Sequence, residues 1–434
     1  MISRALLLVA FALALPLPVW AQSGALVTHA AGVTLVSQSD SSAALVGVEF
    51  TIAAGLDRER LRQDGLAALV AQSVLETPSA GGVSLSDAIA AHGGSVAFTM
   101  EAHDVRFYVE ALATDAPAVL ALFERAAASP DFSAATVRAA RDALMREIAG
   151  SQQEPLQVGI EMLDFAQANG GNSGLPLFGT PASLVQLAPA DASAFYRTYY
   201  RRGGSSISAV GRVDALGARA LESFATMLPV GATAAVKTVT TPLHGNGHEL
   251  VARRSISAPW LVVRYGAPSL GNADYGPMLV LAAFLQRTLS DIGEIPGTIT
   301  PTLASRAVGA EYNFDRVPGE LVLYVDGAID SDPNRTFGAA LSVVNILSAT
   351  RLQGSIAQFK TIAAGDFATR ASTLEARAWL GGAFTRRTGS ADYLRVTLRA
   401  IAATTPGDLQ RVARRYLASP TIALVLPRTT TVQN

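Results

Sequence analysis

Two histidines and a carboxylate stand together near the middle of the chain, in His244-Gly-Asn-Gly-His248-Glu249. Such side chains can bind zinc, which takes nitrogen and oxygen ligands in a tetrahedral set. Gly245 and Gly247, however, disfavour the rigid turn of helix that would hold both histidines on one face. We therefore expect no specific metal site in this segment.

The other residues that could react are scattered. His29, His92 and His103 are isolated in the sequence, and we expect His103 to face solvent at the tip of a hairpin. No serine lies in a Gly-x-Ser-x-Gly elbow, and Gly381-Gly382 does not match a phosphate-binding loop. The chain has no cysteine, which excludes disulfides, thiol chemistry and a lipid-attachment cysteine. These residues therefore indicate neither a nucleophilic enzyme nor a nucleotide-binding protein.

The composition indicates a two-domain globular protein. The chain has 434 residues, 50% of them hydrophobic, which is enough for two domains of about 200 residues with separate cores. The formal net charge is −1, with acidic and basic residues intermixed. Because no basic stripe is present, we expect no nucleic-acid partner.

The N-terminus has the pattern of a secretory signal. Arg4 precedes an apolar run at residues 5–15, and two prolines and Val19-Trp20-Ala21 follow. The run is too short and too interrupted by proline to be a stable membrane anchor. We therefore predict a cleaved signal peptide at residues 1–21 and a bacterial periplasmic protein.

The following residues predict alternating strands and helices. Residues 32–36 and 44–52 are rich in β-branched side chains and predict strands. Residues 66–74 carry apolar side chains at helical spacing. The sequence further predicts a hairpin over residues 96–110 and helices over residues 85–91, 116–128 and 133–149, the last capped by Ser133.

A long-period repeat indicates a duplication. Residues 189–199 and 406–416 share the pattern Pro-x-Asp-x7-Tyr, and each is followed by a short apolar strand that we place at a sheet edge. Locally the pattern is that of a capped helix, with Pro and Asp at its start. Residues 45–75 and 260–289 also correspond, each with a strand, a turn and an apolar helix. We infer two copies of one α+β unit.

The domain boundaries follow from this repeat. We assign residues 22–227 to an N-terminal domain and residues 249–434 to a C-terminal domain. Residues 228–248 are rich in proline, glycine and threonine and lack helical or strand periodicity, so we assign them as the linker.

The segment Gly65-Leu-Ala-Ala-Leu-Val-Ala-Gln72 resembles the active-site helix of the pitrilysin/insulinase family of zinc metallopeptidases, Gly-Leu-Ala-His-x-x-Glu-His. In such a motif two histidines one turn apart share one zinc and the glutamate activates its water. Ala68, Ala71 and Gln72 stand at the three functional positions. The resemblance thus implies a helix that has lost its zinc chemistry.

Two further segments resemble functional parts of the family. Met145-Arg-Glu147-Ile resembles the helix that supplies its third zinc ligand, so Glu147 is either a vestigial ligand or a solvated helix residue. Ser305-Arg306-Ala-Val-Gly309-Ala-Glu-Tyr312 resembles its Arg-Glu-x-x-Gly-x-x-Tyr segment. This implies that Arg306 and Tyr312 bind substrate, a peptide carbonyl or oxyanion. The alternative is a surface charge at Arg306 and a half-buried strand residue at Tyr312.

The resemblance implies an α+β fold of two homologous α/β sandwich domains that face each other across a chamber, as half of a clamshell. It also implies a non-catalytic subunit without its own cofactor, which forms a heterodimer with a zinc-bearing relative and encloses peptides. Homo-oligomerisation stays open. The alternatives are a stand-alone peptide-binding or scaffold protein and a zinc endopeptidase with relocated ligands.

Overall fold

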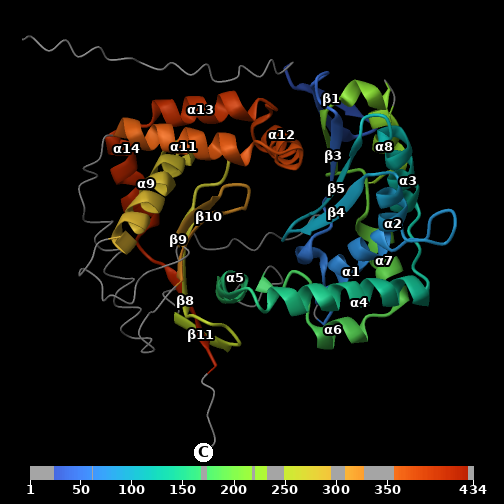
Figure 1. The fold of residues 1–434 in the computed structure, drawn as a ribbon, viewed down its shortest axis with the longest axis horizontal. Coiled ribbons are helices and arrows are strands. Elements are labelled where there is room, and N and C mark those ends of the chain that lie inside the picture. The colour runs from blue at the N-terminus through green and yellow to red at the C-terminus, as the bar shows by residue number, and fades with distance from the viewer. Residues whose placement is uncertain are drawn as a thin grey trace, which may run out of the picture.

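The computed structural model describes residues 24–60, 62–167, 174–217, 220–231, 249–294, 308–326 and 356–428. Within these ranges the fold is α+β, as the sequence predicts, with two mixed sheets and helices packed on them (Figure 1). The predicted signal peptide and most of the predicted linker lie outside the described residues. No helix in the described ranges is both long and apolar enough to span a membrane.

The N-terminal half forms a sheet of six strands in the order β1-β2-β6-β3-β5-β4. Its strands are β1 (Leu26–Ala30), β2 (Val33–Ser39), β3 (Leu45–Ile52), β4 (Ser95–Met100), β5 (Val105–Leu112) and β6 (Ser206–Gly211). Its helices are η1 (Leu56–Arg58), α1 (Leu66–Leu75), α2 (Leu85–Ala91), α3 (Ala116–Ala128), α4 (Ala134–Ser151), α5 (Pro155–Gln167), α6 (Pro181–Gln186), α7 (Pro189–Tyr199), η3 (Val213–Leu216) and α8 (Ala220–Met227).

The C-terminal half forms a sheet of five strands in the order β7-β11-β8-β10-β9. Its strands are β7 (Glu249–Arg254), β8 (Trp260–Ala267), β9 (Val308–Asn313), β10 (Gly319–Asp326) and β11 (Thr421–Pro427). Its described helices are α9 (Tyr275–Glu294), α11 (Ile356–Arg370), α12 (Leu374–Thr388), α13 (Tyr393–Ala403) and α14 (Pro406–Tyr416).

The two repeat segments form corresponding helices, α7 and α14. The carboxylate of Asp191 accepts a hydrogen bond from the N–H of Ala188 at 2.8 Å, and that of Asp408 accepts one from Thr405 at 3.0 Å. Both aspartates therefore hold the first turn of their helix, as the Pro-x-Asp pattern predicts. The strands that follow these helices are β6 and β11. Each pairs antiparallel with the strand that precedes the first long helix of its half: β6 with β3, and β11 with β8. The order of elements thus reflects a duplicated unit.

The prediction that these two strands lie at sheet edges is wrong. β6 runs between β2 and β3, and β11 runs between β7 and β8. Every residue of β6 is buried, and so are six of the seven residues of β11. A continuous apolar run is typical of a strand with neighbours on both sides, so the pattern indicated a central strand.

Helix α1 lies inside the first core, packed against α4 and α7. All of its residues except Gln72 are buried, as expected of a helix that is apolar on nearly every side. Gly65 precedes it with φ of 88°, and a Cβ there would lie 2.6 Å from the carbonyl oxygen of Phe178. Glycine is therefore required where the 175–180 loop meets the start of α1.

The two halves exchange helices. α5, from the first half, packs on β8 and β11 of the second sheet, and α12, from the second half, packs on β3 and β6 of the first sheet (Figure 1). Leu163 of α5 shares a small apolar core with Val262, Val322 and Ala423. Each sheet therefore has one face covered by a helix from the other half of the chain.

Close backbone packing at this exchange is testable at Gly159 of α5, where a Cβ would lie 2.5 Å from Cγ2 of Val262. A Cβ added at Gly365 in α11 would have no neighbouring atom within 4 Å, so Gly365 serves as the matched control. Both Gly→Ala changes favour the helix by up to about 1 kcal/mol. We expect G159A to be less stable than G365A by about 1–3 kcal/mol, from overpacking against stiff Val262.

The measurement is the urea midpoint of each variant against the unaltered protein. Equal stability of G159A and G365A would contradict the close packing of α5 on the second sheet.

Candidate functional site

The three positions that resemble a zinc motif lie on α1. Ala68 and Ala71 are fully buried and carry no donor atom. Gln72 is half-buried, and its Nε2 donates to Oε1 of Glu76 at 2.9 Å. Glu147, on α4, is exposed. The side chains at these positions do not fit a zinc ion, which needs about three protein ligands.

Histidines and carboxylates elsewhere in the described ranges do not form such a set either. No group of three or more His, Asp or Glu side chains there could hold a metal. The side chain of His103, expected to face solvent, is 43% exposed, and its Nδ1 lies 2.8 Å from Oδ2 of Asp57. This hydrogen bond raises the pKa of His103. His244 and His248 lie outside the described residues.

Glu59 organises the start of α1, which the sequence analysis missed. Its Oε2 accepts the N–H of Gly65 at 3.2 Å, and its Oε1 accepts the N–H of Ala67 at 2.9 Å. Burial raises the pKa of Glu59 to about 8, against the effect of these hydrogen bonds. The only sequence signal was an acidic residue shortly before an apolar helix, which is too common to single out.

This buried carboxyl predicts a pH dependence of stability. Because its pKa is higher in the folded protein, the folded state holds this proton more tightly than the unfolded chain. The stabilisation is complete below its ordinary pKa of 4.5 and is lost as the pH rises through about 8. In E59Q, whose amide resembles the protonated acid, this loss is absent. The stability of the unaltered protein relative to E59Q should fall by about 1.4 kcal/mol per pH unit within this window.

The measurement is the free energy of unfolding of both proteins across this pH range. Exposed Glu222, changed to Gln, is the matched control and should leave the pH profile unaltered. A parallel profile for E59Q would contradict the raised pKa.

Of the two proposed substrate-binding residues, Tyr312 lies in β9 and Arg306 lies outside the described residues. Tyr312 is buried in the second core, and its hydroxyl donates to the carbonyl of Pro268. Its ring packs beside Tyr275 and Phe314. In this arrangement the Tyr312 hydroxyl is engaged inside the domain, and the substrate-binding role of the pair stays a prediction.

A buried ionic network lies where α12 meets the first sheet. Nη1 of Arg106 lies 3.6 Å from Oε2 of Glu49, and its Nη2 lies 3.0 Å from Oε1 of Glu101. Nη1 of Arg386, from α12, donates to the hydroxyls of Ser206 and Thr51 at 2.6 and 3.2 Å. Burial raises the pKa of Glu49 to about 7, although Arg106 and Arg386 oppose the rise.

A second network lies where α5 meets the other sheet. Arg264 is 2% exposed, and its Nη1 lies 2.7 Å from Oδ1 of Asp164 in α5. Its Nε lies 3.0 Å from Oε2 of Glu320. Nη1 of Arg316 lies 3.1 Å from Asp164 and 3.0 Å from Glu320. Burial disfavours the charge on Arg316, but Glu320 and Asp164 outweigh it and raise its pKa.

The two networks occupy equivalent positions with inverted charge. Arg106 stands opposite Thr51, two residues beyond Glu49, on the paired strand. Glu320 likewise stands opposite Gly266, two residues beyond Arg264. Four positions in one network are equivalent to four in the other: Glu49 to Arg264, Arg106 to Glu320, Glu101 to Arg316 and Arg386 to Asp164. Each position has the opposite sign in the other half.

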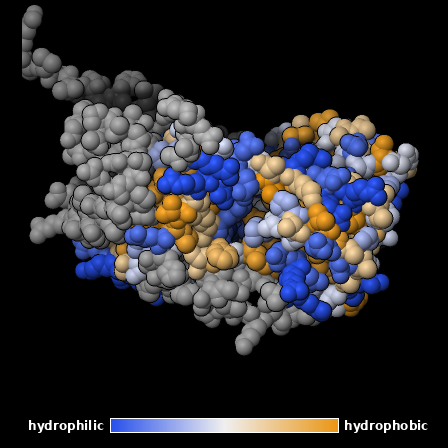
Figure 2. Space-filling model, turned by 90° about the horizontal axis from the view of Figure 1, so that it is seen from below, coloured by the Kyte–Doolittle hydropathy of each residue, from blue (hydrophilic) through white to orange (hydrophobic). Residues whose placement is uncertain are grey.

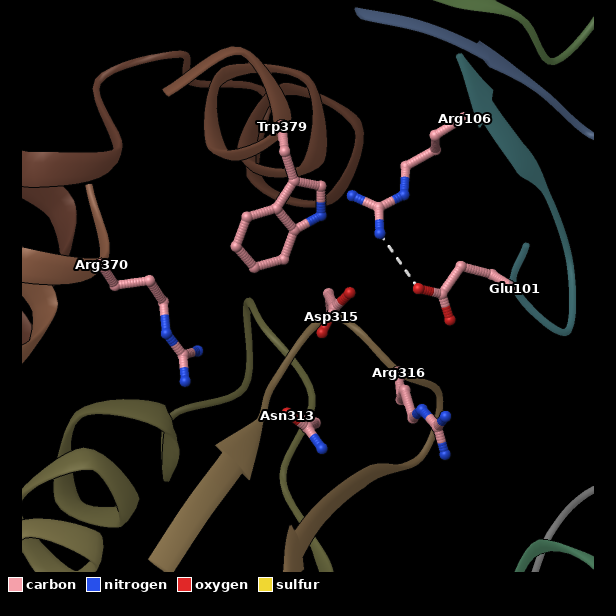
Figure 3. A pocket seen from close by; sticks show the side chains of 7 residues that line it. All are labelled: Glu101, Arg106, Asn313, Asp315, Arg316, Arg370 and Trp379. Atoms are coloured by element: carbon pink, nitrogen blue, oxygen red, sulfur yellow. Dashed lines mark hydrogen bonds and ion pairs between the residues drawn. The ribbon is translucent and has the colours of Figure 1, made fainter. Parts of the chain in front are cut away.

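A pocket of about 260 Å³ lies between the halves where these networks meet. It is lined by Glu101, Arg106, Asn313, Asp315, Arg316, Arg370 and Trp379 (Figure 3). Seen from below, the surface is hollowed between the halves (Figure 2). The pocket combines charges of both signs from elements far apart in the sequence, so sequence patterns could not find it.

The ion pair that joins α5 to the second sheet is testable at Asp164. D164N keeps the shape but leaves Arg264, 2% exposed, with less compensation for its charge. We expect a loss of about 3 kcal/mol in the free energy of unfolding. The control is D392N, which alters the exposed pair with Arg395, keeps an N-cap side chain on α13 and should cost below about 1 kcal/mol.

Chemical denaturation of both variants is the measurement. A D164N loss no larger than that of D392N would contradict the dependence of buried Arg264 on Asp164 for charge compensation.

Comparisons with known proteins show a family similarity in the N-terminal half. Residues 34–181 match the model described as Insulinase (Peptidase family M16). This part of the chain is therefore similar to the peptidase M16 (insulinase) family, as the resemblance of α1 indicated. A comparison with curated protein sequences finds no match.

Solved structures share the fold over nearly the whole chain. A peptidase M16 inactive domain from Pseudomonas fluorescens has 16% identity and a TM-score of 0.78, covering 93% of this chain and 98% of that one. A protease from Helicobacter pylori has 14% identity and a TM-score of 0.77, covering 93% and 99%. A chain of complex III2 from Candida albicans has 14% identity and a TM-score of 0.73, covering 93% and 96%. The two-domain M16 fold is thus confirmed.

Proposed function

We propose that this chain is a non-catalytic subunit that pairs with a zinc-bearing relative and completes a chamber for peptides. The observation that carries the proposal is α1. The helix keeps the position and packing of a core helix, while its three motif positions hold Ala68, Ala71 and Gln72. A chain with this helix contributes shape to a peptidase and leaves the zinc chemistry to its partner.

The similarity to a structure described as an M16 inactive domain supports this proposal. The duplicated halves and the hollow between them (Figure 2) offer a surface that a second, related chain could close. The sequence pattern of residues 1–21 supports export, so we place the pair in the periplasm.

A second candidate is a scaffold or stand-alone peptide-binding protein. The similarity to a chain of complex III2, a multi-subunit assembly, favours it. Under this alternative the chain holds other subunits or peptides together, and no peptidase activity depends on it.

The test is affinity purification of the tagged, full-length protein from its native cells, with zinc and peptidase activity measured on the product. We expect a relative with an intact His-x-x-Glu-His motif to copurify, with about one zinc per pair. Activity should require both chains. The isolated chain should bind no stoichiometric zinc and hydrolyse no peptide, because buried alanines replace two of its motif residues.

The control is a pair whose partner has its motif glutamate changed to Gln, which should copurify equally and be inactive. Zinc-dependent activity in the isolated chain would overturn the proposal. A partner without the motif would favour the scaffold function, as would full activity of the relative alone.

A further inference from the structure

The pocket between the halves is built from two hairpin ends and two helices. Glu101 and Arg106 come from the β4–β5 hairpin, and Asn313, Asp315 and Arg316 come from the β9–β10 hairpin. Arg370 ends α11 and Trp379 lies in α12 (Figure 3). Such a junction between domains is a common place for a small-molecule site.

Most of the charged groups in this pocket are already engaged. Arg106 is held by Glu101 and Glu49, and Arg316 is held by Asp164 and Glu320. These pairs fix the wall of the pocket, and they neutralise one another.

Two charges lack such a partner among the described residues. Arg370 donates through Nη1 to the carbonyl oxygen of Tyr312 at 3.3 Å and stacks on Phe314, but it forms no ion pair there. No hydrogen bond or ion pair joins Asp315 to another described residue, although its charge interacts with those of Arg106, Arg316 and Arg387. The pocket therefore offers one guanidinium and one carboxylate that a ligand can engage.

Trp379 gives the pocket a rigid side. Phe314 stacks on its ring at 5.8 Å, and the guanidinium of Arg106 lies 5.6 Å from the ring centre. Its ring is therefore held in place where it lines the cavity.

We propose that this pocket binds a small zwitterion, a free amino acid or a dipeptide. The ligand carboxylate pairs with Arg370, and the ligand ammonium pairs with Asp315. The volume of about 260 Å³ is slightly below the roughly 300–1,000 Å³ of sites for drug-sized ligands, which matches a small occupant. The inference goes beyond the proposed function and does not depend on a partner subunit.

The mixed charge of the walls argues against singly charged ligands. A simple anion at Arg370 would leave the Asp315 carboxylate uncompensated, with Glu101 also lining the pocket. A simple cation at Asp315 would lie among the guanidinium groups of Arg316, Arg106 and Arg370. A zwitterion pairs with both Arg370 and Asp315 at once.

The experiment is titration calorimetry of the isolated mature chain with alanyl-alanine as the probe. We expect saturable binding at millimolar or lower concentration. N-acetyl-alanyl-alanine, which lacks the ammonium, and alanyl-alanine amide, which lacks the carboxylate, should each bind at least about tenfold more weakly.

Variants locate the site. R370Q and D315N should each weaken alanyl-alanine binding by about tenfold or more. Arg399→Gln on α13 and Asp142→Asn on α4 alter exposed charges elsewhere and should leave binding unchanged. Unaltered melting temperatures of all four variants would establish that they fold.

Absence of alanyl-alanine binding by the unaltered chain would overturn the proposal, as would equal binding of both blocked analogues. Binding that persists in R370Q and D315N would overturn the location. Binding of inorganic phosphate alone would show an anion site instead. Binding of a longer peptide blocked at both ends tests the chamber of the proposed function separately. Such a peptide has no terminal charge to pair with Arg370 or Asp315.

Discussion

The structure depends on the reciprocal docking of two helices. Each half of the chain builds a sheet and covers one of its faces, and the remaining face is covered by a helix from the other half, α12 on the first sheet and α5 on the second. Burying apolar surface contributes about 25 cal/mol per Å². Because each sheet obtains part of this burial only from the opposite half, the halves stabilise each other, and the pocket between them is a product of that docking.

The opposite charges of the two networks favour one relative arrangement of the halves. Buried ion pairs contribute little net stability but disfavour wrong arrangements strongly, because a misplaced partner leaves a buried charge alone. The hairpin ends that meet at the pocket carry Glu101 on one side and Arg316 on the other, and each favours the charged form of the other. Identical networks in two duplicated halves would have brought like charges together here. Inversion makes the same contact attractive.

The local part of the fold could be predicted from the sequence, whereas the contacts between the halves could not. The Pro-x-Asp pattern predicted α7 and α14 because a helix N-terminus is determined within a few residues. The central positions of β6 and β11 were missed because strand order depends on distant partners. Glu49 lies in a mostly apolar strand, a signal of buried charge, but Arg386, whose charge also favours its ionised form, is hundreds of residues away. The ligand-facing pair Asp315 and Arg370 likewise follows only from tertiary structure.

The apolar side chains at the motif-like positions of α1 also have a structural consequence. Histidine and glutamate side chains inside a core need a metal or hydrogen-bond partners, since a buried polar group without one costs roughly 1–3 kcal/mol. Ala68 and Ala71 remove this need, and α1 packs as a buried apolar helix. Glu59 still fixes its first turn, through the N–H groups of Gly65 and Ala67. The helix therefore packs as a structural element of the first half, and the pocket that we propose as a ligand site lies between the halves.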